Sequence, residues 1–318
     1  MHRNSILLIL FLFAACKKDL LHYKSVQQLD AHTTTDRFDR ILFVNNNVGF
    51  IVGGQRFANA SILKTTDGGY TWNYTTYPNA GKEIFGIVAS PNGTLYCIGF
   101  DGKLLYSADT GNTWQFKQMM YLPYTDMAVI DSNHIFLTGG SSFNSGFTSI
   151  MDTRNLTQTY DSLAYQLNRT KFSNSSTGFT CGYGAALKSI DAGHSWNFLQ
   201  VGGDDFTGID VHGSEMWVCG YNGGIYHSTD AGCSWEKLRN GNDLTLIRYN
   251  LQDIVFKDSQ NGWAVGENGV VIHSIDGGHN WSQYDQFTSN GLKCVSICAN
   301  GDLLVAGYNG ALYRLNVQ

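Results

Sequence analysis

A motif built around one aspartate and one tryptophan recurs along this chain of 318 residues and constrains its fold more than any other feature. Each copy reads Ser/Thr-x-Asp-x-Gly-x-(Thr/Ser/Asn)-Trp, and the tryptophan always follows the aspartate by five residues. Five complete copies span residues 65–72, 107–114, 189–196, 228–235 and 274–281, and a degenerate sixth copy at 149–152 keeps Asp152 without the tryptophan. Successive aspartates lie 39 to 46 residues apart, which is the length of one four-stranded blade of a β-propeller.

The sequence upstream of each motif also repeats, and it predicts the inner strands of each blade. A short apolar strand, a polar turn and a second strand bounded by two glycines recur, as at residues 178–182 and 262–266. Abundant glycine (36 residues) and scarce proline (3 residues) suit many short strands joined by tight turns. A seventh upstream half, residues 295–313, lacks an outermost strand, which residues 22–29 can supply. The sequence therefore predicts an all-β, seven-bladed propeller closed by its N-terminal strand, with six or eight blades as alternatives.

The first 15 residues are typical of a targeting segment rather than of a folded domain. Arg3 gives a positive start, and the apolar run at residues 6–15 is shorter than the roughly 20 residues that span a bilayer. The run ends in Leu-Phe-Ala-Ala-Cys16, which resembles the lipobox of bacterial lipoproteins. That resemblance implies cleavage before Cys16 and its acylation, with an ordinary signal peptide or a cytosolic start as the alternative. We expect a signal peptide at 1–15, a lipidated tether at 16–21 and one propeller domain at 22–318, anchored to a bacterial envelope membrane.

The repeated motif resembles the Asp-box, also known as the bacterial neuraminidase repeat. The longer frame, from Asp253 through Gly262-Trp-Ala-Val-Gly to Ser274-Ile-Asp-Gly-Gly-His-Asn-Trp281, resembles the photosystem II assembly and stability factor family over residues 36–318. This resemblance implies a non-catalytic scaffold that binds or assembles proteins, and it does not imply photosynthesis. In known Asp-box propellers the motif lies in the outer turns between the third and fourth strands. The resemblance therefore implies a structural role for the motif here.

The opposite face of the predicted propeller carries candidate binding residues. There, the loops between second and third strands and the loops between blades meet around the central channel. The repeat frame places four aromatic side chains and one carboxylate on this rim, namely Phe100, Tyr183, Tyr221, Tyr308 and Glu267. Aromatic rings with polar tips suit a surface that binds a peptide or a glycan. The alternative is that these rings pack between neighbouring blades.

Arginines are a second signal on the same rim. Arg40 and Arg169 align with Asp253 at the start of the innermost strand, and Arg37, Arg56 and Arg248 fall in loops of that face. Guanidinium groups bind carboxylates and phosphates through paired hydrogen bonds, so these arginines predict an acidic partner segment. The alternative is that they pair with carboxylates of the rim itself, such as Asp36, Asp39 and Asp253.

Catalysis has little support in the sequence, although a glycan-binding protein or a glycoside hydrolase of the sialidase or xyloglucanase type remains the alternative function. The Arg-Ile-Pro motif that accompanies the sialidase arginine triad is absent. Asp204, Asp205 and Asp253 are the carboxylates that a paired-aspartate site could use. None of the nine histidines forms a close pair with metal-ligand spacing, so we expect neither a metal nor a cofactor.

Charge and cysteine content complete the sequence-based expectations. The formal net charge of −5 argues against a nucleic-acid partner. We therefore expect a protein or peptide partner, with a glycan as the alternative, and contact with the membrane through the lipid anchor. Six cysteines remain after Cys16, and their spacing suggests no disulfide framework. We expect them to be mostly unpaired, buried thiols.

Overall fold

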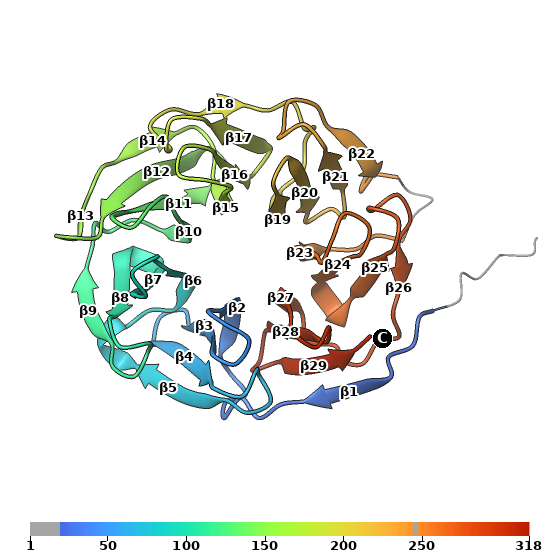
Figure 1. Ribbon diagram of the computed structural model, residues 1–318, viewed down its shortest axis with the longest axis horizontal. Helices are drawn as coiled ribbons and strands as arrows, with labels where there is room; N and C mark the ends of the chain where they lie inside the picture. The colour runs from blue at the N-terminus through green and yellow to red at the C-terminus, as the bar shows by residue number, and fades with distance from the viewer. Residues whose placement is uncertain (1–19, 244–246, 318) are drawn as a thin grey trace, which may run out of the picture.

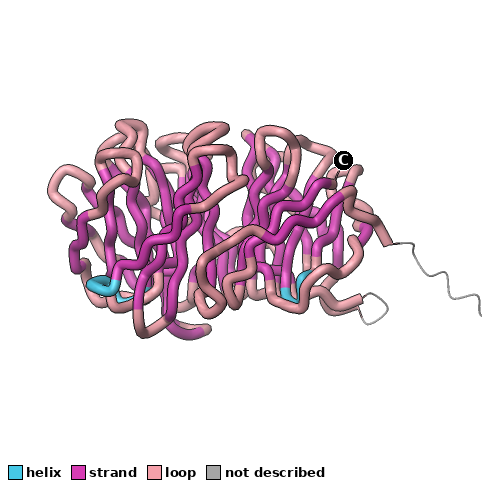
Figure 2. Tube along the Cα trace, turned by 90° about the horizontal axis from the view of Figure 1, so that it is seen from below, coloured by secondary structure: helices cyan, strands magenta, loops and turns pink. Residues whose placement is uncertain are grey.

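Seven antiparallel sheets stand as blades around a central channel in the computed structural model, which describes residues 20–243 and 247–317 (Figure 1). In each of the first six blades the strands follow one another in sequence order from the channel outward. Seen from the side, the strands run between the two faces of the propeller, and loops cover both faces (Figure 2). The predicted all-β, seven-bladed architecture is confirmed.

The first three blades contain the following strands. Blade 1 contains β2 (Arg37–Phe43), β3 (Gly49–Gln55), β4 (Asn59–Thr65) and β5 (Asn73–Tyr77). Blade 2 contains β6 (Ile84–Ala89), β7 (Leu95–Gly99), β8 (Lys103–Ser107) and β9 (Gln115–Gln118). Blade 3 contains β10 (Tyr124–Val129), β11 (His134–Ser142), β12 (Ser145–Asp152) and β13 (Thr157–Gln158), and β14 (Asp161–Leu163) also pairs with β12.

The other four blades repeat this order. Blade 4 contains β15 (Leu167–Phe172), β16 (Gly178–Gly182), β17 (Ala185–Ser189) and β18 (Asn197–Phe198). Blade 5 contains β19 (Phe206–His212), β20 (Glu215–Gly220), β21 (Ile225–Ser228) and β22 (Glu236–Arg239). Blade 6 contains β23 (Leu251–Phe256), β24 (Gly262–Gly266), β25 (Val271–Ser274) and β26 (Ser282–Gln283). Blade 7 contains β27 (Leu292–Ile297), β28 (Leu303–Gly307), β29 (Leu312–Asn316) and, outermost, β1 (Ser25–Gln28). Three short 3-10 turns are η1 (Pro78–Ala80), η2 (Phe100–Gly102) and η3 (Glu267–Gly269).

The hydrophobic core lies between neighbouring blades. Between blades 1 and 2, Phe50 and Ile62 pack with Ile84 and Leu95, and all four side chains are buried. Each second strand is covered by a neighbouring blade on each face of its sheet. Its side chains are therefore buried on both faces, and all five residues of β24 are buried. This double burial explains why the second strands read as continuous apolar runs rather than as alternating patterns.

Five of the seven second strands end in glycine, and in blades 2 and 6 the steric cause is specific. A Cβ atom on Gly266 would lie 2.2 Å from the backbone oxygen of Asn250, in the loop that enters the blade. On Gly99 it would lie 2.2 Å from the backbone oxygen of Glu83. Only a residue without a side chain lets the inter-blade loop cross the strand end this closely. These two glycines therefore allow the backbone of the inter-blade loop to pass close to the end of the second strand.

The Asp motif forms the turn between the third and fourth strands, as predicted, and its polar atoms are used within the turn. In blade 4, Asp191 Oδ1 accepts hydrogen bonds from Ser195 N (2.9 Å) and Ser189 Oγ (2.8 Å), and Oδ2 accepts one from Ser195 Oγ (2.6 Å). These bonds lower the pKa of Asp191 to about 2. Trp196 Nε1 donates to the Gly193 carbonyl at 3.0 Å. The motif is therefore occupied by local structure in this blade.

The N-terminal strand completes blade 7. β1 pairs antiparallel with β29 over its whole length, with Ser25 opposite Asn316 and Gln28 opposite Tyr313. This is the segment from which the sequence analysis expected the missing strand. All four side chains of β1 are exposed, so the pairing depends on backbone hydrogen bonds rather than on side-chain burial. The propeller is thus closed by strands from the two ends of the chain.

Residues just before β1 also hold the N-terminal segment against blade 6. Leu21 forms a parallel bridge with Tyr284, and the Tyr23 ring stacks on the Tyr284 ring with centroids 4.4 Å apart. His22 Nδ1 forms an ion pair with Asp285. The N-terminal segment therefore contacts two adjacent blades.

The expected signal peptide and Cys16 lie outside the described residues. Within residues 20–243 and 247–317, no helix is long and apolar enough to cross a membrane. The six other cysteines are all free thiols; five are buried, as predicted, and Cys233 is exposed.

Candidate binding site in the mouth of the channel

Every innermost strand contains a β-bulge at the same position near its first residues. The pairing register with the second strand shifts between Phe38 and Arg40 in β2, for example, and between Leu167 and Arg169 in β15. A bulge leaves one extra residue out of the ladder and redirects its side chain. The extra residues are Asp39, Phe85, Thr125, Asn168, Thr207, Gln252 and Lys293, one from each blade. All seven line one cavity of about 450 Å³, which we name the mouth.

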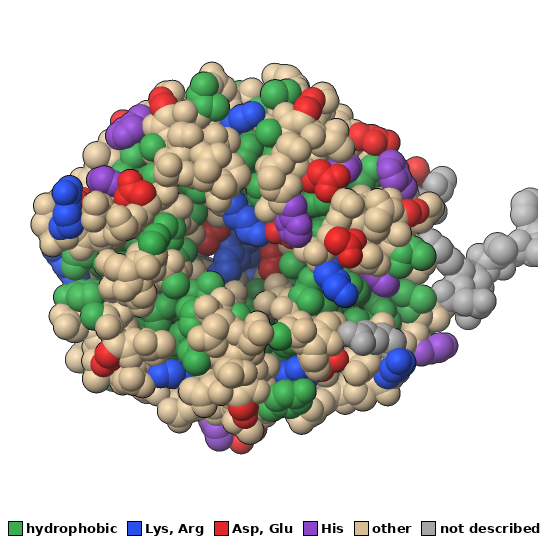
Figure 3. Space-filling model, in the orientation of Figure 1, with side chains coloured by type: hydrophobic (Ala, Val, Ile, Leu, Met, Phe, Trp, Pro, Cys, Tyr) green, Lys and Arg blue, Asp and Glu red, His purple; other side chains and the backbone are tan. Residues whose placement is uncertain are grey.

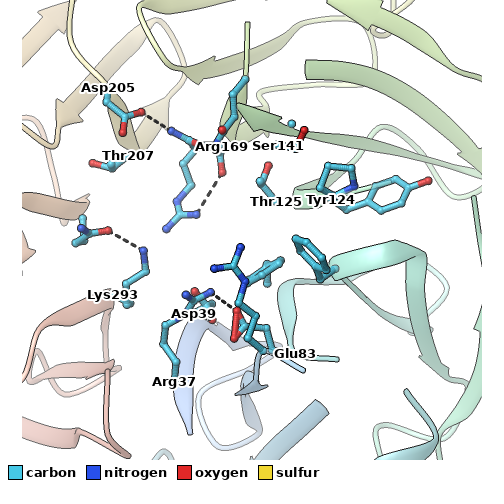
Figure 4. A pocket seen from close by; sticks show the side chains of 18 of the residues that line it. Arg37, Asp39, Glu83, Tyr124, Thr125, Ser141, Arg169, Asp205, Thr207 and Lys293 are labelled. Atoms are coloured by element: carbon cyan, nitrogen blue, oxygen red, sulfur yellow. Dashed lines mark hydrogen bonds and ion pairs between the residues drawn. The ribbon is translucent and has the colours of Figure 1, made fainter. Parts of the chain in front are cut away.

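Loops of one propeller face complete the wall of the mouth. Inter-blade loops contribute Glu83 and Asp205, and β2 contributes its first residue, Arg37. Loops between second and third strands contribute Arg56, Phe100 and Tyr221. The space-filling view shows basic and acidic side chains inside the central hollow (Figure 3). In the close-up, Arg169 and Lys293 point into the pocket from different blades (Figure 4). The mouth is therefore a polar, charged cavity to which all seven blades contribute.

One part of the wall contains an arginine shared by two buried carboxyl groups. Arg37 Nη2 donates to Glu83 Oε1 at 2.6 Å, and Arg37 Nε donates to Asp39 Oδ2 at 3.0 Å. Burial, together with repulsion from Asp39, raises the pKa of Glu83 to about 7, against the opposing attraction of Arg37. The Arg37 charge is therefore neutralised within the wall.

A second layer of charged residues lies deeper in the channel, at the strand positions that follow the bulge residues. Arg40 Nη2 pairs with Asp126 Oδ2 at 2.7 Å, and Arg40, Asp126, Arg169 and Asp253 line a further cavity of about 360 Å³. Burial opposes the charge on Arg40, but Asp126 and Asp253 outweigh it and raise its pKa. Arg169 lines both cavities.

Three cations of the mouth differ from Arg37 and Arg40, because no ion pair links them to a carboxylate within residues 20–243 and 247–317. Arg169 Nη1 donates to the Asn168 carbonyl at 3.3 Å, and its buried Nε has no hydrogen-bond partner. Lys293 Nζ donates to the neutral Gln252 Oε1 at 2.7 Å. The third cation, Arg56, contacts two aromatic rings.

Burial disfavours the charge on two of these groups. It lowers the pKa of Lys293 to about 8, and burial together with the nearby Arg40 lowers the pKa of Arg169. An anion placed between them would relieve both effects, because the nearby carboxylates Asp39, Asp126 and Asp253 offset burial only in part. The mouth therefore has the electrostatic character of an anion-binding site.

Five of the residues that the sequence places on this face line the mouth, namely Arg37, Arg56, Phe100, Arg169 and Tyr221. Arg40 lies in the deeper layer and is paired with Asp126.

The other selected residues lie around the mouth without lining it. Arg248 Nη2 donates to Asn222 Oδ1 at 2.8 Å, and Glu267 Oε1 accepts from Gln252 Nε2 at 3.1 Å. Tyr183 stacks on Phe143 with centroids 4.2 Å apart, and Tyr308 lies 5.8 Å from the Arg37 guanidinium.

Sequence reasoning did not select Lys293, Glu83 or the exposed Phe57. The repeat frame aligns Lys293 with Asp39, Asn168 and Gln252, all polar residues next to the selected Arg40, Arg169 and Asp253. A polar residue repeated at this position was the available signal. Phe57 lies in the loop between second and third strands of blade 1, one residue after the selected Arg56.

The carboxylates considered for a hydrolase site are engaged in structural bonds. Asp204 is buried and accepts from the backbone N–H groups of Asp205, Asn222 and Gly224. Asp253 Oδ2 accepts from Val295 N at 3.1 Å. In the part of the chain that the structure describes, no group of three or more His, Cys, Asp or Glu side chains is arranged to hold a metal ion.

Solved structures with the same architecture cover nearly the whole chain. YCF48 from Cyanidioschyzon merolae is 17% identical, with a TM-score of 0.68 and coverage of 92% of this chain and 98% of that one. A structure described as YCF48 bound to D1 peptide is 14% identical, with a TM-score of 0.72 and coverage of 96% and 100%. The RRP9 WD40 repeats are 10% identical, with a TM-score of 0.71 and coverage of 95% and 100%. At these identities the likeness shows the propeller fold alone.

Sequence comparison is more specific. No curated protein matches the chain. The family described as photosynthesis system II assembly factor YCF48 matches residues 19–119 and 159–247, which together exceed half of the chain. The interval between the two matched segments, 120–158, contains most of blade 3, whose Asp motif is incomplete, and residues 248–318 also lie outside the match. The resemblance inferred from the repeat is thus confirmed, and the chain belongs to the YCF48 assembly factor family.

Proposed function

We propose that this chain is a non-catalytic, protein-binding propeller that holds an acidic segment of a partner protein in the mouth while a membrane complex is assembled. The family is described by an assembly role, and one solved relative is bound to a peptide. The observation that carries the proposal is the set of cations without carboxylate partners, Arg56, Arg169 and Lys293, around a cavity of about 450 Å³ among the described residues.

An acidic segment fits this cavity for electrostatic reasons. A carboxylate from a partner would accept hydrogen bonds from a guanidinium or ammonium group at the point where their charges are least compensated. The bulge residues Asn168, Thr207 and Gln252 offer further polar contacts along the wall. Exposed backbone or side-chain amides of a peptide can use these contacts, which suits a flexible segment better than a single small ion.

The test is capture of the partner from the native membrane by chemical cross-linking, with the wild-type chain and an Arg169→Met/Lys293→Met variant. We expect the variant to lose most of the captured partner without a lower Tm, because the folded protein disfavours both charges. Capture by the wild type should also weaken as salt rises, since the attraction that draws an acidic segment toward the mouth is screened over about 8–10 Å at physiological ionic strength.

An Arg154→Met variant is the matched control. Arg154 is an exposed arginine paired with Asp152 in the degenerate Asp motif of blade 3, away from the mouth. It should capture the partner as the wild type does. Equal capture by the Arg169/Lys293 variant would show that the mouth does not bind the partner.

We also propose that Cys16 anchors the protein to a bacterial envelope membrane, facing the periplasm or the cell exterior. The lipobox-like sequence before Cys16 supports this, as does the placement of Leu21 directly against blade 6, which leaves only a short tether. A Cys16→Ser variant should lose metabolic acyl labelling and move from the membrane to the soluble fraction. Retention of both the label and the membrane fraction would contradict the anchor.

A further inference from the structure

An exposed aromatic surface lies beside the mouth on blades 1 and 2. Phe57, in the turn between β3 and β4, has 68% of its surface exposed. Its ring meets the Phe100 ring edge to face, with centroids 6.2 Å apart, and Phe100 meets Phe85 at 6.5 Å. Since Phe85 and Phe100 line the mouth, the aromatic rings form a continuous path from the surface into the cavity.

Two cations make cation–π contacts with these rings. Lys82 Nζ lies 4.4 Å from the centre of the Phe57 ring, and the Arg56 guanidinium lies 5.4 Å from the centres of both Phe57 and Phe100. Lys82 is also paired with Asp101 at 3.3 Å, whereas Arg56 has no ion pair among the described residues. We name Arg56, Phe57, Lys82 and Phe100 the shelf.

The shelf combines two features that isolated surface phenylalanines lack. A single exposed apolar residue is ordinary, but here the exposed ring continues into a binding cavity and is flanked by a cation with free donors. An incoming aromatic ring could cover the open face of Phe57, while a carboxylate next to it in the ligand could reach Arg56.

We propose that the shelf binds an aromatic side chain of the partner peptide, next to the acidic residues that enter the mouth. The inference rests on the proposed function and adds a specificity to it: the segment contains an aromatic residue adjacent in sequence to carboxylates. A peptide is favoured over a glycan because the flanking groups of the shelf are cations, and its phenylalanine rings carry no polar tip to bind sugar hydroxyls.

The test uses blocked, fluorescently labelled peptides of glutamates around one central residue, either phenylalanine or leucine. Fluorescence anisotropy should show that the wild-type chain binds both peptides and binds the phenylalanine peptide roughly fivefold to tenfold more tightly. A Phe57→Ala variant should bind both with the affinity of the leucine peptide. A Phe57→Tyr variant should restore the preference, because it keeps the ring.

Phe198→Ala is the control, since Phe198 is a half-exposed phenylalanine on the outer strand β18 of blade 4. It should keep the full preference. Equal binding of the two peptides by the wild type, or an unchanged preference in Phe57→Ala, would contradict aromatic binding by the shelf. It would not contradict binding of acidic residues in the mouth. Failure of both peptides to bind would overturn the acidic site as well. Tighter binding of a sialylated oligosaccharide than of the phenylalanine peptide would overturn the assignment to a peptide.

Discussion

Two titratable side chains determine the charge of the mouth near neutral pH. Glu83 has a pKa raised to about 7 because it is buried beside Asp39, and Lys293 has a pKa lowered to about 8 because it is buried. Below pH 7, Glu83 is mostly protonated and Lys293 is mostly charged. Above pH 8, Glu83 is negative and Lys293 is mostly neutral, so the charge of the mouth falls by nearly two units between pH 6 and pH 9.

We therefore expect an acidic peptide to bind more weakly as pH rises from 6 to 9. The glutamates of the peptide are ionised throughout this range, so the change comes from the protein. The expected loss is roughly tenfold, which corresponds to about 1.4 kcal/mol of binding free energy. Anisotropy titrations with the phenylalanine peptide at fixed ionic strength would measure it.

Two variants separate the contributions to this pH dependence. Glu83→Gln should remove the part of the loss that occurs near pH 7, and Lys293→Arg should remove the part near pH 8, because arginine stays charged. A pH profile that is unchanged in both variants would show that other groups control binding.

At the scale of single elements, the sequence predicts hairpins well and bulges poorly. The loops between second and third strands were located from their repeated glycines, and Asp101-Gly102 and Asn268-Gly269 adopt the positive φ angles that such tight turns require. This is why Phe100 and Tyr221 could be placed at the mouth before the structure was known.

The bulges leave a weaker mark in the sequence, a mostly polar residue repeated at one position of the innermost strand. One extra residue in an innermost strand changes which side chains face the channel but leaves the apolar residues around it in place. Lys293 therefore reads as an ordinary polar strand residue, and the ion pair between Arg40 and Asp126 joins strands of different blades that no local pattern relates. Whether an arginine is free or paired depends on such contacts between blades.

At the scale of the whole molecule, the repeat predicts the propeller because each blade is stabilised by its neighbours. Apolar faces of adjacent blades form the core, as between Phe50 and Ile84, so no blade can be removed without exposing two others. Closure is the weak point of such an arrangement, since the last blade depends on a strand from the other end of the chain. That strand, β1, buries none of its side chains, unlike the strands it completes.

We expect closure to depend on the backbone of β1 and not on its side chains. A Val26→Pro/Gln27→Pro variant removes the Gln27 N–H that faces β29, since alternate residues of an antiparallel strand donate to their neighbour. The two prolines also bend the strand, which breaks the ladder with β29 and exposes an edge. Each lost backbone hydrogen bond costs about 1 kcal/mol, so thermal unfolding followed by circular dichroism should show Tm lowered by several degrees, with aggregation on heating. Val26→Ala/Gln27→Ala keeps the backbone donors and should unfold close to the wild-type temperature, because both side chains are exposed. If the alanine pair lowers Tm as much as the proline pair, side-chain contacts hold the closure; if neither lowers it, the propeller is stable without this strand.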